Sequence, residues 1–559
     1  MTSFMGKILR VDLSARTAEA VSIPPEVYEA VLAGKGLAAW YLYRNIPAGA
    51  DPLGPDNILC FAAGALCGTG AFLTGRWTVA CKSPLTGGWG DASCGGVFAP
   101  AIKQCGYDAI FISGAAEEPV YLFCDGKTTE LRGAGDLWGL DATEAENALH
   151  KALDPVCRKK PCVACIGTAG EKRSLISGIC NEGGRIAARS GVGAVMGSKK
   201  LKAVALAGSL PMPCHDSETV KALSKELGQK LLKLTLPSGL GRFLGAGGRL
   251  MGRLPVLPMD GALTASMFRE WGTHANTSLA ITSGDGPIKN WGGAPRDARG
   301  MESVYEPAHI SRMETVKYHC YSCPLGCGGK LNIRGRKYAR FDETHKPEYE
   351  TIESFGPLLL NRSLDSVLQL NEMLSRAGMD SISAGNTVAW AIECYENGIL
   401  TKEQTDGLEL HWGNTEAILA LVEKMIRREG FGDALADGVK RVFRTLRREG
   451  IRHARRRAGA GHARRAQRSA ARYPFCGRAG PREAHRRDGD RLRLDGTLRH
   501  LLLGAARRSA QQGGRFFGNG ADGSGLKSQR LLQHAYRRCR RLLLRADDGR
   551  THVEARGLS

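Results

Sequence analysis

The sequence lacks a long apolar segment. Its longest apolar run, residues 58–73, is interrupted by glycines and falls short of the ~20 apolar residues that span a bilayer. No basic stretch followed by an apolar core opens the chain, as it would in a secretory signal. We therefore expect a cytoplasmic protein that does not enter a membrane. In that reducing compartment, clusters among the 17 cysteines favour metal binding over disulfides.

The first 440 residues also lack net charge. They hold 47 Lys or Arg and 47 Asp or Glu, whereas residues 441–559 hold 31 and 9, so the net charge of +22 lies in the last 119 residues. Of these 31 basic residues, 30 are Arg and one, Lys527, is Lys. This avoidance of lysine favours translation of a GC-rich gene in a shifted frame over selection for a basic surface. A basic tail that binds nucleic acid is the alternative.

Two regions with different sequence periods precede the Arg-rich segment. Up to about residue 210, short β-prone runs alternate with glycine and Asp/Asn turns, as at residues 8–13, 109–113, 120–124 and 199–206. The predicted fold class is therefore α+β, with an N-terminal β-sheet domain followed by mostly α-helical domains.

Helical periods with recognisable ends begin after that region. Asp216 is a predicted N-cap of a helix to about residue 234, Gly378 ends a second helix, and Asn414 caps a third that Gly430 ends. The sequence predicts a β-rich domain at residues 1–212 and a helical domain with the cysteines at residues 213–415. The start of a third helical domain follows at residues 416–445, and an out-of-frame segment at residues 446–559.

Three cysteines stand at the spacing C-x2-C-x3-C. Cys320, Cys323 and Cys327 are separated by Pro324 and Gly326, which bend the backbone, so the three thiolates can converge on one iron-sulfur cluster. A zinc half-site is the alternative, but it needs a second C-x2-C or a His pair downstream, and the sequence has neither. A four-iron cluster needs a fourth ligand.

A second group of cysteines has the spacing of a plant-type two-iron cluster. Cys157, Cys162 and Cys165 are spaced C-x4-C-x2-C, and Cys180 follows. Residues 162–167 have the composition of a strand that enters a glycine turn, so Cys162 and Cys165 would point to opposite faces of the sheet. We predict that this group does not bind a cluster.

Three glycine-rich elements lie in the β region, at residues 68–76, 90–96 and 185–193. Each combines a closely approachable backbone with an Arg or another polar side chain, which suits phosphates and a polar ring system held at loops. None has the G-x-G-x-x-G pattern between a strand and a helix, so a Rossmann nucleotide site is excluded.

The chain resembles the tungsten-containing aldehyde ferredoxin oxidoreductases over about residues 5–440. Several blocks carry the resemblance, in the order and spacing of that family. They are residues 76–87 (RWTVACKSPLTG), 95–96, 106–108 (GYD), 191–199 (GVGAVMGSK), the cysteine motif, 347–351 (PEYET) and 380–385 (DSISAG).

The resemblance implies an enzyme that oxidises aldehydes to carboxylic acids. Its members bind tungsten, or molybdenum, through two pterins, beside one 4Fe-4S cluster that passes electrons to ferredoxin. A Mg²⁺ ion that bridges the pterin phosphates and assembly into a homo-oligomer are further expectations. Neither a membrane nor nucleic acid is an expected partner.

The resemblance also assigns roles to individual residues. Glu350 is the expected carboxylate beside the metal, where burial would raise its pKa and suit it to shuttle a proton. The other assigned residues are Arg76, Ser93, Gly95 and Arg185 at the pterins and their phosphates, Asp380 and Gly385 at a pterin, and Cys320, Cys323 and Cys327 at the cluster. From the residues alone, Asp380 is equally a predicted N-cap of a helix that begins at Ser381.

The sequence departs from the family after about residue 440. The family's Asp-x-x-Gly-Leu-Cys element, whose Cys is the fourth cluster ligand, has no counterpart, because Gly-Leu-Cys does not occur in the chain. Cys476 and Cys539 lack its surroundings, and His453, His462 and His485 lack those of the expected catalytic-site histidine. We therefore predict that the polypeptide folds incompletely or binds its cofactors poorly.

Three alternatives to aldehyde oxidation stay open at this point. A related tungstopterin enzyme that reduces an aromatic acyl-CoA would use the same cofactors. A protein that binds nucleic acid through residues 445–559 would belong to another class, and a frame-shifted product would be inactive.

Overall fold

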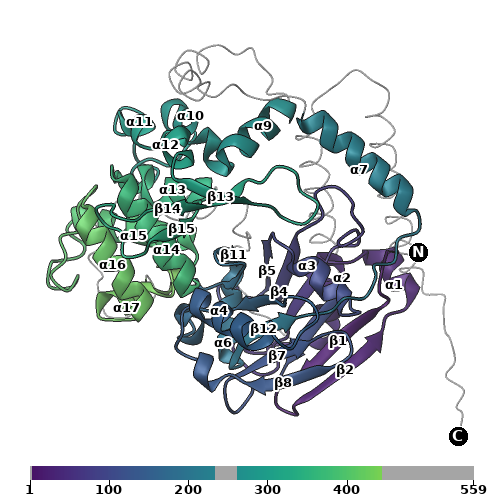
Figure 1. Cartoon of the computed structure of the whole chain (residues 1–559). Helices are drawn as coiled ribbons and strands as arrows, with labels where there is room; N and C mark the ends of the chain where they lie inside the picture. Colours follow the sequence, from purple (N-terminus) through teal and green to yellow (C-terminus); the bar gives the residue numbers. More distant parts are fainter. Residues whose placement is uncertain (1–2, 233–260, 443–559) are drawn as a thin grey trace, which may run out of the picture. The chain divides into compact units, whose positions relative to one another are not determined.

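A computed structural model describes residues 3–232 and 261–442 of the chain (Figure 1). Residue contacts divide the chain into two compact units, residues 1–255 with 265–479, and residues 256–264 with 480–559. Of the second unit, the structure describes residues 261–264. All that follows concerns the first unit. Among the described helices, none is long and apolar enough to cross a membrane.

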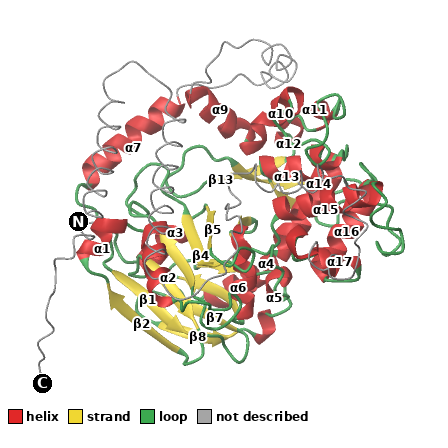
Figure 2. Cartoon of the chain, turned by 180° about the vertical axis from the view of Figure 1, so that it is seen from behind, coloured by secondary structure: helices red, strands yellow, loops and turns green. Residues whose placement is uncertain are grey.

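The N-terminal region contains two six-stranded sheets (Figure 2). The first has the order β2-β1-β6-β3-β4-β5, in which β1 and β6 are parallel and the other pairs antiparallel. Its strands are β1 (Lys7–Asp12), β2 (Thr17–Ser22), β3 (Leu59–Ala63), β4 (Trp77–Lys82), β5 (Trp89–Cys94) and β6 (Ala109–Ser113).

The second sheet has the order β11-β10-β9-β12-β7-β8, with β7 and β12 parallel. Its strands are β7 (Val120–Cys124), β8 (Thr129–Gly133), β9 (Cys162–Cys165), β10 (Ile179–Asn181), β11 (Arg185–Ala187) and β12 (Leu201–Leu206). The helices that accompany both sheets are α1 (Pro25–Val31), α2 (Lys35–Asn45), α3 (Phe98–Gln104), α4 (Ala142–Leu153), α5 (Thr168–Glu171) and α6 (Val192–Ser198).

The central strands of both sheets are buried on both faces, because alternate side chains enter different cores, whereas the edge strands β2 and β8 are largely exposed or half-buried. Leu9 of β1 and Val204 of β12 belong to one core between the sheets, which α3 and α6 also fill. Ile8 packs on the opposite face with α1 and α2, whereas Ala203 packs with α4. The strands therefore contain near-continuous apolar runs, as their sequences predict.

Helices and one small sheet form the remaining described chain. Strands β13 (Glu314–Tyr318), β14 (Gly328–Asn332) and β15 (Glu343–His345) make a three-stranded antiparallel sheet. The helices are α7 (Ser217–Leu232), α9 (Gly261–Trp271), α10 (Thr277–Ser283), α11 (Met301–Val304), α12 (Pro307–Ser311), α13 (Tyr349–Phe355), α14 (Leu364–Ala377), α15 (Ser381–Glu396), α16 (Thr415–Arg427) and α17 (Phe431–Leu435). Short 3-10 turns are Gly135–Leu137, Arg189–Gly191, Thr273–Asn276 and Pro357–Leu359.

The predicted α+β class is confirmed, as are the helix starts at Asp216 and Asn414 and the end at Gly378. The helix predicted to end at Gly430 ends at Arg427 with Arg428 as its C-cap, and Gly430 precedes α17. Asp216 accepts a hydrogen bond from the Thr219 amide at 2.9 Å, Gly378 ends α14 with a φ of +70°, and Asn414 caps α16. The reading of the first 210 residues as strands and turns alone is wrong, because α1 to α6 lie there. The sequence shows one of these helices at Asp141, which forms a capping box with Glu144.

The mostly helical middle region also contains a sheet that the sequence analysis missed, β13 to β15. Glu314 to Tyr318 is a short β-prone run that pairs with β14, 10 to 17 residues later in the chain, and β14 in turn pairs with β15. The domain boundaries at residues 212 and 415 stay predictions. The out-of-frame segment, the predicted nucleic-acid-binding tail and the end of the helix after Asp216 lie outside the described residues.

Candidate functional site

The cysteine motif forms the loop between β13 and β14, and loops of the first sheet hold it in place. The Tyr321 amide donates to the Gly96 carbonyl at 3.0 Å, and the Tyr321 hydroxyl donates to the Gly68 carbonyl at 2.9 Å. Gly75 has no room for a side chain, because a Cβ atom there would lie 2.6 Å from the Tyr321 amide nitrogen. Glycine-rich loops of the sheet domain therefore pack against the cysteine loop and hydrogen-bond to it.

Arg185 connects this loop to the second sheet. Its guanidinium donates to the Cys320 sulfur at 3.2 Å from Nη1 and pairs with Glu182 at 3.1 Å from Nε. The same guanidinium lies over the Tyr318 ring, 4.6 Å from the ring centre. A thiolate at Cys320 is thus stabilised by a charge-assisted hydrogen bond.

Gly95 allows this contact, and Arg76 and Ser93 lie beside it. A Cβ atom on Gly95 would lie 2.6 Å from the Cys320 sulfur and 3.1 Å from Arg185 Nη1. Arg76 Nη2 donates to the Ser93 carbonyl at 3.0 Å, across the β4–β5 pair. The structure therefore brings Gly95 and Arg185 next to Cys320, and Arg76 to Ser93 at the end of the same strand, β5.

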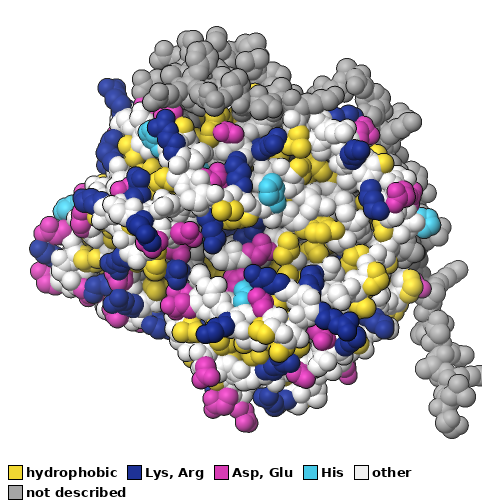
Figure 3. Space-filling model, in the orientation of Figure 1, with side chains coloured by type: hydrophobic (Ala, Val, Ile, Leu, Met, Phe, Trp, Pro, Cys, Tyr) yellow, Lys and Arg dark blue, Asp and Glu magenta, His cyan; other side chains and the backbone are white. Residues whose placement is uncertain are grey.

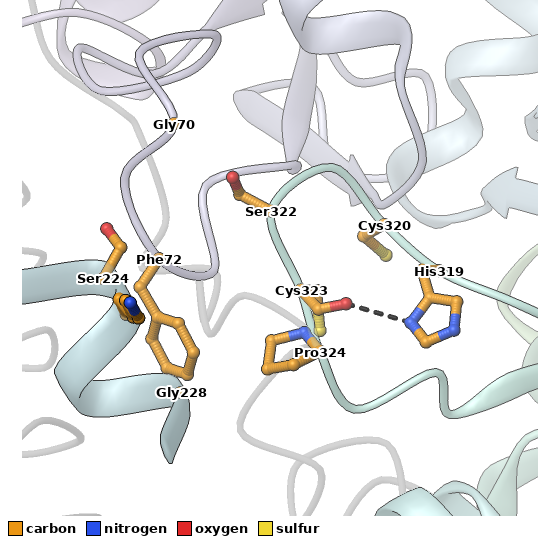
Figure 4. A pocket seen from close by; sticks show the side chains of 10 residues that line it. Gly70, Phe72, Ser224, Gly228, His319, Cys320, Ser322, Cys323 and Pro324 are labelled. Carbon is orange, nitrogen blue, oxygen red and sulfur yellow. Dashed lines mark hydrogen bonds between the residues drawn. The ribbon is translucent and has the colours of Figure 1, made fainter. Parts of the chain in front are cut away.

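The cysteine loop borders a pocket of about 470 Å³ (Figure 4). The loop lies on one side, and Phe72 and α7 lie on the other. His319 Nδ1 lies 3.0 Å from the Cys323 carbonyl oxygen, which fixes the bend of the loop. The pocket is lined by Gly70, Phe72, Ser224, Lys225, Gly228, His319, Cys320, Ser322, Cys323 and Pro324.

The environment of the thiols distinguishes between kinds of metal site. Burial raises the pKa of Cys327 to about 11 and also raises that of Cys323, so without a bound cation these thiols stay protonated at neutral pH. Among residues 3–232 and 261–442, no three His, Cys, Asp or Glu side chains converge tightly enough for a single metal ion. The thiolates of an iron-sulfur cluster lie farther apart than the ligands of a single zinc ion.

The second cysteine group is divided between two cores. Cys162 and Cys165 are the ends of β9, and Cys165 is buried in the core beside α4, whereas Cys162 packs against the core between the sheets. The prediction that these two thiols point to opposite faces is confirmed.

Asp380 and Gly385 lie at the start of α15. Asp380 accepts from the Ile382 amide at 3.2 Å and pairs with Arg189 at 3.2 Å, so the predicted N-cap is confirmed. A Cβ atom on Gly385 would lie 2.7 Å from the Ser354 side chain and carbonyl oxygen. Gly385 therefore permits close packing of α15 on α13, a contact that the sequence analysis did not foresee.

Two carboxylates lie at the beginning of α13. Glu350 lies in the first turn, and Glu348 is the N-cap and accepts a hydrogen bond from the Thr273 hydroxyl. Glu348 is exposed, yet surrounding protein raises its pKa, and Arg185 and Arg76 act in the opposite direction. The charges of both arginines therefore act on the pKa of Glu348. The sequence analysis assigned the carboxylate beside the metal to Glu350. The sequence alone does not show where α13 begins, and therefore does not show that Glu348 is its N-cap and Glu350 lies in its first turn.

His345 is a further residue that the sequence analysis missed. Burial and the charge of Arg185 lower the pKa of His345 to about 4, so its imidazole is neutral at physiological pH. The Ser375 hydroxyl lies 3.5 Å from its Nε2, and Gly184 packs against the ring. Acidic, basic and histidine side chains gather near the middle of the face in Figure 3. No motif in the sequence indicated this histidine.

Comparison with known proteins gives the family. Residues 8–208 match the model of the aldehyde ferredoxin oxidoreductase N-terminal domain, and residues 258–478 match the model of domains 2 and 3. The second match continues past residue 440, where the sequence motifs stop.

Two curated relatives are tungsten-containing aldehyde ferredoxin oxidoreductases. The protein of Pyrococcus furiosus is 36% identical over 445 residues, and that of Thermococcus kodakarensis 35% over 441 residues. Each match covers 78% of this chain and 66% of the relative, so the chain spans about two thirds of their length.

A solved structure is similar as well. It is the active site complex BamBC of benzoyl coenzyme A reductase with 1,5-dienoyl-CoA, at a TM-score of 0.65 and 27% identity. The match covers 83% of this chain and 65% of that one. With these relatives and both family models matched, the chain belongs to the aldehyde ferredoxin oxidoreductase family of oxidoreductases.

Proposed function

We propose that this protein oxidises aldehydes to carboxylic acids and passes the electrons to ferredoxin. The observation that carries the proposal is the convergence of Gly95 and Arg185 on Cys320, with Arg76 hydrogen-bonded to the same strand at Ser93. Cationic side chains and open glycine backbone from the sheet domain there meet the thiols of the cysteine loop. Tungsten-containing aldehyde oxidoreductases at 36% and 35% identity, against 27% for the acyl-CoA enzyme, support the same substrate class.

The thiols fit a 4Fe-4S cluster for three of its four ligands. Cys320 and Cys323 border the pocket, and Gly95 leaves space at Cys320. The sequence offers no counterpart of the family's fourth ligand, since Cys476 and Cys539 lack the surroundings of that element and lie outside the described residues. When bound, the cluster and a tungsten or molybdenum bis-pterin would supply the redox chemistry.

The chain's own residues would manage the protons of the reaction. An aldehyde and water give a carboxylic acid, two electrons and two protons. We assign Glu350 as the proton acceptor, as the family resemblance implies, because the Thr273 hydroxyl already engages Glu348. Arg76 and Arg185 would bind the anionic pterin phosphates, and Asp380 would hold a pterin through its remaining acceptor capacity.

Expression of the full chain with tungstate, without oxygen, tests the proposal. We expect only a fraction of the purified protein to contain tungsten and iron, and that fraction to reduce ferredoxin with an aldehyde, with both the metals and the activity lost in Cys323→Ser. Protein that contains the metals but oxidises no aldehyde would overturn the proposal. Stoichiometric metals with aldehyde oxidation would overturn the prediction that this chain folds incompletely.

A second function is favoured by one observation, the structural similarity to the benzoyl coenzyme A reductase complex. The same site could then act on an aromatic acyl-CoA. The two functions differ in a direct assay, since oxidation of a cyclic dienoyl-CoA without activity on aldehydes would support the second and exclude the first. The same preparation serves for both assays.

A further inference from the structure

The cysteine loop offers three thiols to a cluster that takes four ligands, and a histidine stands beside them. His319 follows β13 directly and precedes Cys320, and its side chain lines the same pocket as those of Cys320 and Cys323 (Figure 4). Among the described residues that line this pocket, only the cysteines and His319 have side chains that bind iron readily, since the ammonium of Lys225 has no lone pair to donate. The imidazole of His319 is therefore a candidate fourth ligand.

A hydrogen bond sets the tautomer of the His319 ring. Nδ1 lies 3.0 Å from the Cys323 carbonyl oxygen, which can only accept, so Nδ1 carries the proton of the neutral ring. Nε2 then keeps its lone pair, and no hydrogen bond within residues 3–232 and 261–442 occupies that atom. Metal-binding histidines typically donate their other ring N–H to a carbonyl in this way, which orients the ring and makes the free nitrogen more basic. The loop thus holds Nε2 in the state that binds a metal.

A glycine in the cysteine loop makes room for the ring. A Cβ atom on Gly326 would lie 2.5 Å from His319 Cε1 and 2.9 Å from His319 Nε2, so the imidazole packs directly on the backbone there. Gly326 also has a φ of +58°, a conformation that disfavours other residues. Because Gly326 precedes Cys327, His319 contacts the loop at both ends of the segment between Cys323 and Cys327.

We propose that Nε2 of His319 is the fourth protein ligand of the 4Fe-4S cluster in this chain. The proposal rests on the proposed function for the cluster itself, and it supplies a ligand where the family's fourth cysteine has no counterpart. Residues 319–327 then hold all four irons. A neutral imidazole in place of a thiolate leaves the cluster with one negative charge less, which favours its reduced state and raises its reduction potential, as in two-iron clusters with histidine ligands.

Electron paramagnetic resonance of the reduced cluster tests the ligand without any need for activity. The full chain is prepared with ordinary and with ¹⁵N-labelled histidine, reconstituted with ferrous iron and sulfide without oxygen, and reduced with dithionite. We expect hyperfine coupling to a nitrogen that changes with the label. The coupling should be lost in His319→Ala and kept in the control His411→Ala, whose ring lies 3.1 Å from Glu396. A reduced cluster without this coupling, a coupling that survives in His319→Ala, or a chain that forms no cluster would overturn the proposal.

The ratio of iron to sulfide is a second measure, and it does not depend on the fraction of chains that hold a cluster. We expect a ratio of about 1 in the unmutated chain and about 0.75 in His319→Ala, because an iron without a protein ligand is readily lost. His319→Asn keeps a donor for the Cys323 carbonyl and should lose iron as well. His319→Cys should keep the ratio, lose the nitrogen coupling and lower the reduction potential. A ratio of about 1 in both His319→Ala and His319→Asn would show that the ring only fixes the bend of the loop.

Aldehyde assays separate this inference from the proposed function. Nitrogen coupling in a protein that contains tungsten and iron but oxidises no aldehyde would establish His319 as a ligand and refute the proposed function. Aldehyde oxidation by a protein whose reduced cluster shows no such coupling would uphold the function and refute the role of His319.

Discussion

The sheet domain and the helical region bury charged side chains in opposite ways. Lys103, Lys199 and Lys202 of the sheet domain have no exposed surface, and the ammonium group of each donates to backbone carbonyls. Glu353 of the helical region is equally buried and has no hydrogen-bond partner among the described residues. Paired charges fix the loops of a scaffold, whereas an unpaired one indicates a site. The predictions below test this difference.

The largest effect is expected at Lys103. Its ammonium donates to the carbonyls of Ser3 and Ala65, both at 2.7 Å, and lies 3.8 Å from Asp108. Lys103→Met would leave the carboxylate and two carbonyls without this partner, so we expect a loss of about 3–5 kcal/mol in the free energy of unfolding. Urea unfolding measures it. The exposed Lys221 is the control, and Lys221→Met should leave the midpoint unchanged.

A loss below about 1 kcal/mol in Lys103→Met would contradict the structural role of buried lysines in the sheet domain. It would mean that Asp108, which also accepts from the Gly6 amide and the Tyr28 hydroxyl, is satisfied without the lysine.

A smaller loss of stability is expected when alanine replaces glycines that differ in the space around them. Gly385→Ala would place a Cβ atom 2.7 Å from Ser354 and push α15 away from α13, at a cost of about 1–3 kcal/mol. Gly133→Ala in β8 meets nothing within 4 Å, so its effect should stay within about 0.5 kcal/mol. Thermal unfolding of both variants gives the comparison. Equal losses in the two variants would show that the packing of α15 on α13 does not require a glycine at position 385. Its role would then be in cofactor binding alone.

The pH dependence of stability should separate the two kinds of buried carboxyl. Glu353 has a raised pKa, so the folded state keeps a proton that the unfolded state releases. Stability should therefore fall as pH rises above the unfolded pKa, by about 1.4 kcal/mol per pH unit, until Glu353 ionises. Glu353→Gln should remove this slope. Urea unfolding from pH 4.5 to pH 7 measures it, and identical slopes with and without Glu353 would show an ionised or exposed group.

Glu423 is the matched carboxyl, whose pKa is shifted in the opposite direction to that of Glu353. Arg340 lowers its pKa, so the stability that it contributes is present above the unfolded pKa and is lost as pH falls through the folded pKa. Glu423→Gln should therefore change the acid side of the same profile and leave the neutral side flat.

The sequence predicts the elements that depend on local patterns. Short β-prone runs between turns predict the strands at Ile8 and Val120. The pleat of a strand separates Cys162 from Cys165, because successive side chains face opposite ways. Asp380 as an N-cap is equally local. The helices of the sheet domain were missed, because short amphipathic runs between strands have no long apolar period.

The candidate site was only partly predictable, because its geometry depends on distant segments. Cys320 meets Arg185 across 135 residues, a contact that the family resemblance implied only as two separate roles. The position of Glu348 depends on the residue at which α13 begins. The burial of Glu353 depends on Gly286, in a loop 67 residues earlier. No local sequence pattern indicates which residues so far apart in the chain come into contact.

The smallest effect is expected when a cysteine of the sheet domain is changed. Cys162→Ser should leave the iron content of the purified protein unchanged, because burial raises the pKa of Cys162 to about 11 and its neighbour Cys165 lies in another core. Cys323→Ser, in the pocket beside Cys320, is the matched positive control and should lose iron. Iron analysis of both variants decides. Loss of iron in Cys162→Ser would mean that the sheet domain holds a two-iron cluster, and that a thiol split between two cores can still be recruited to a metal.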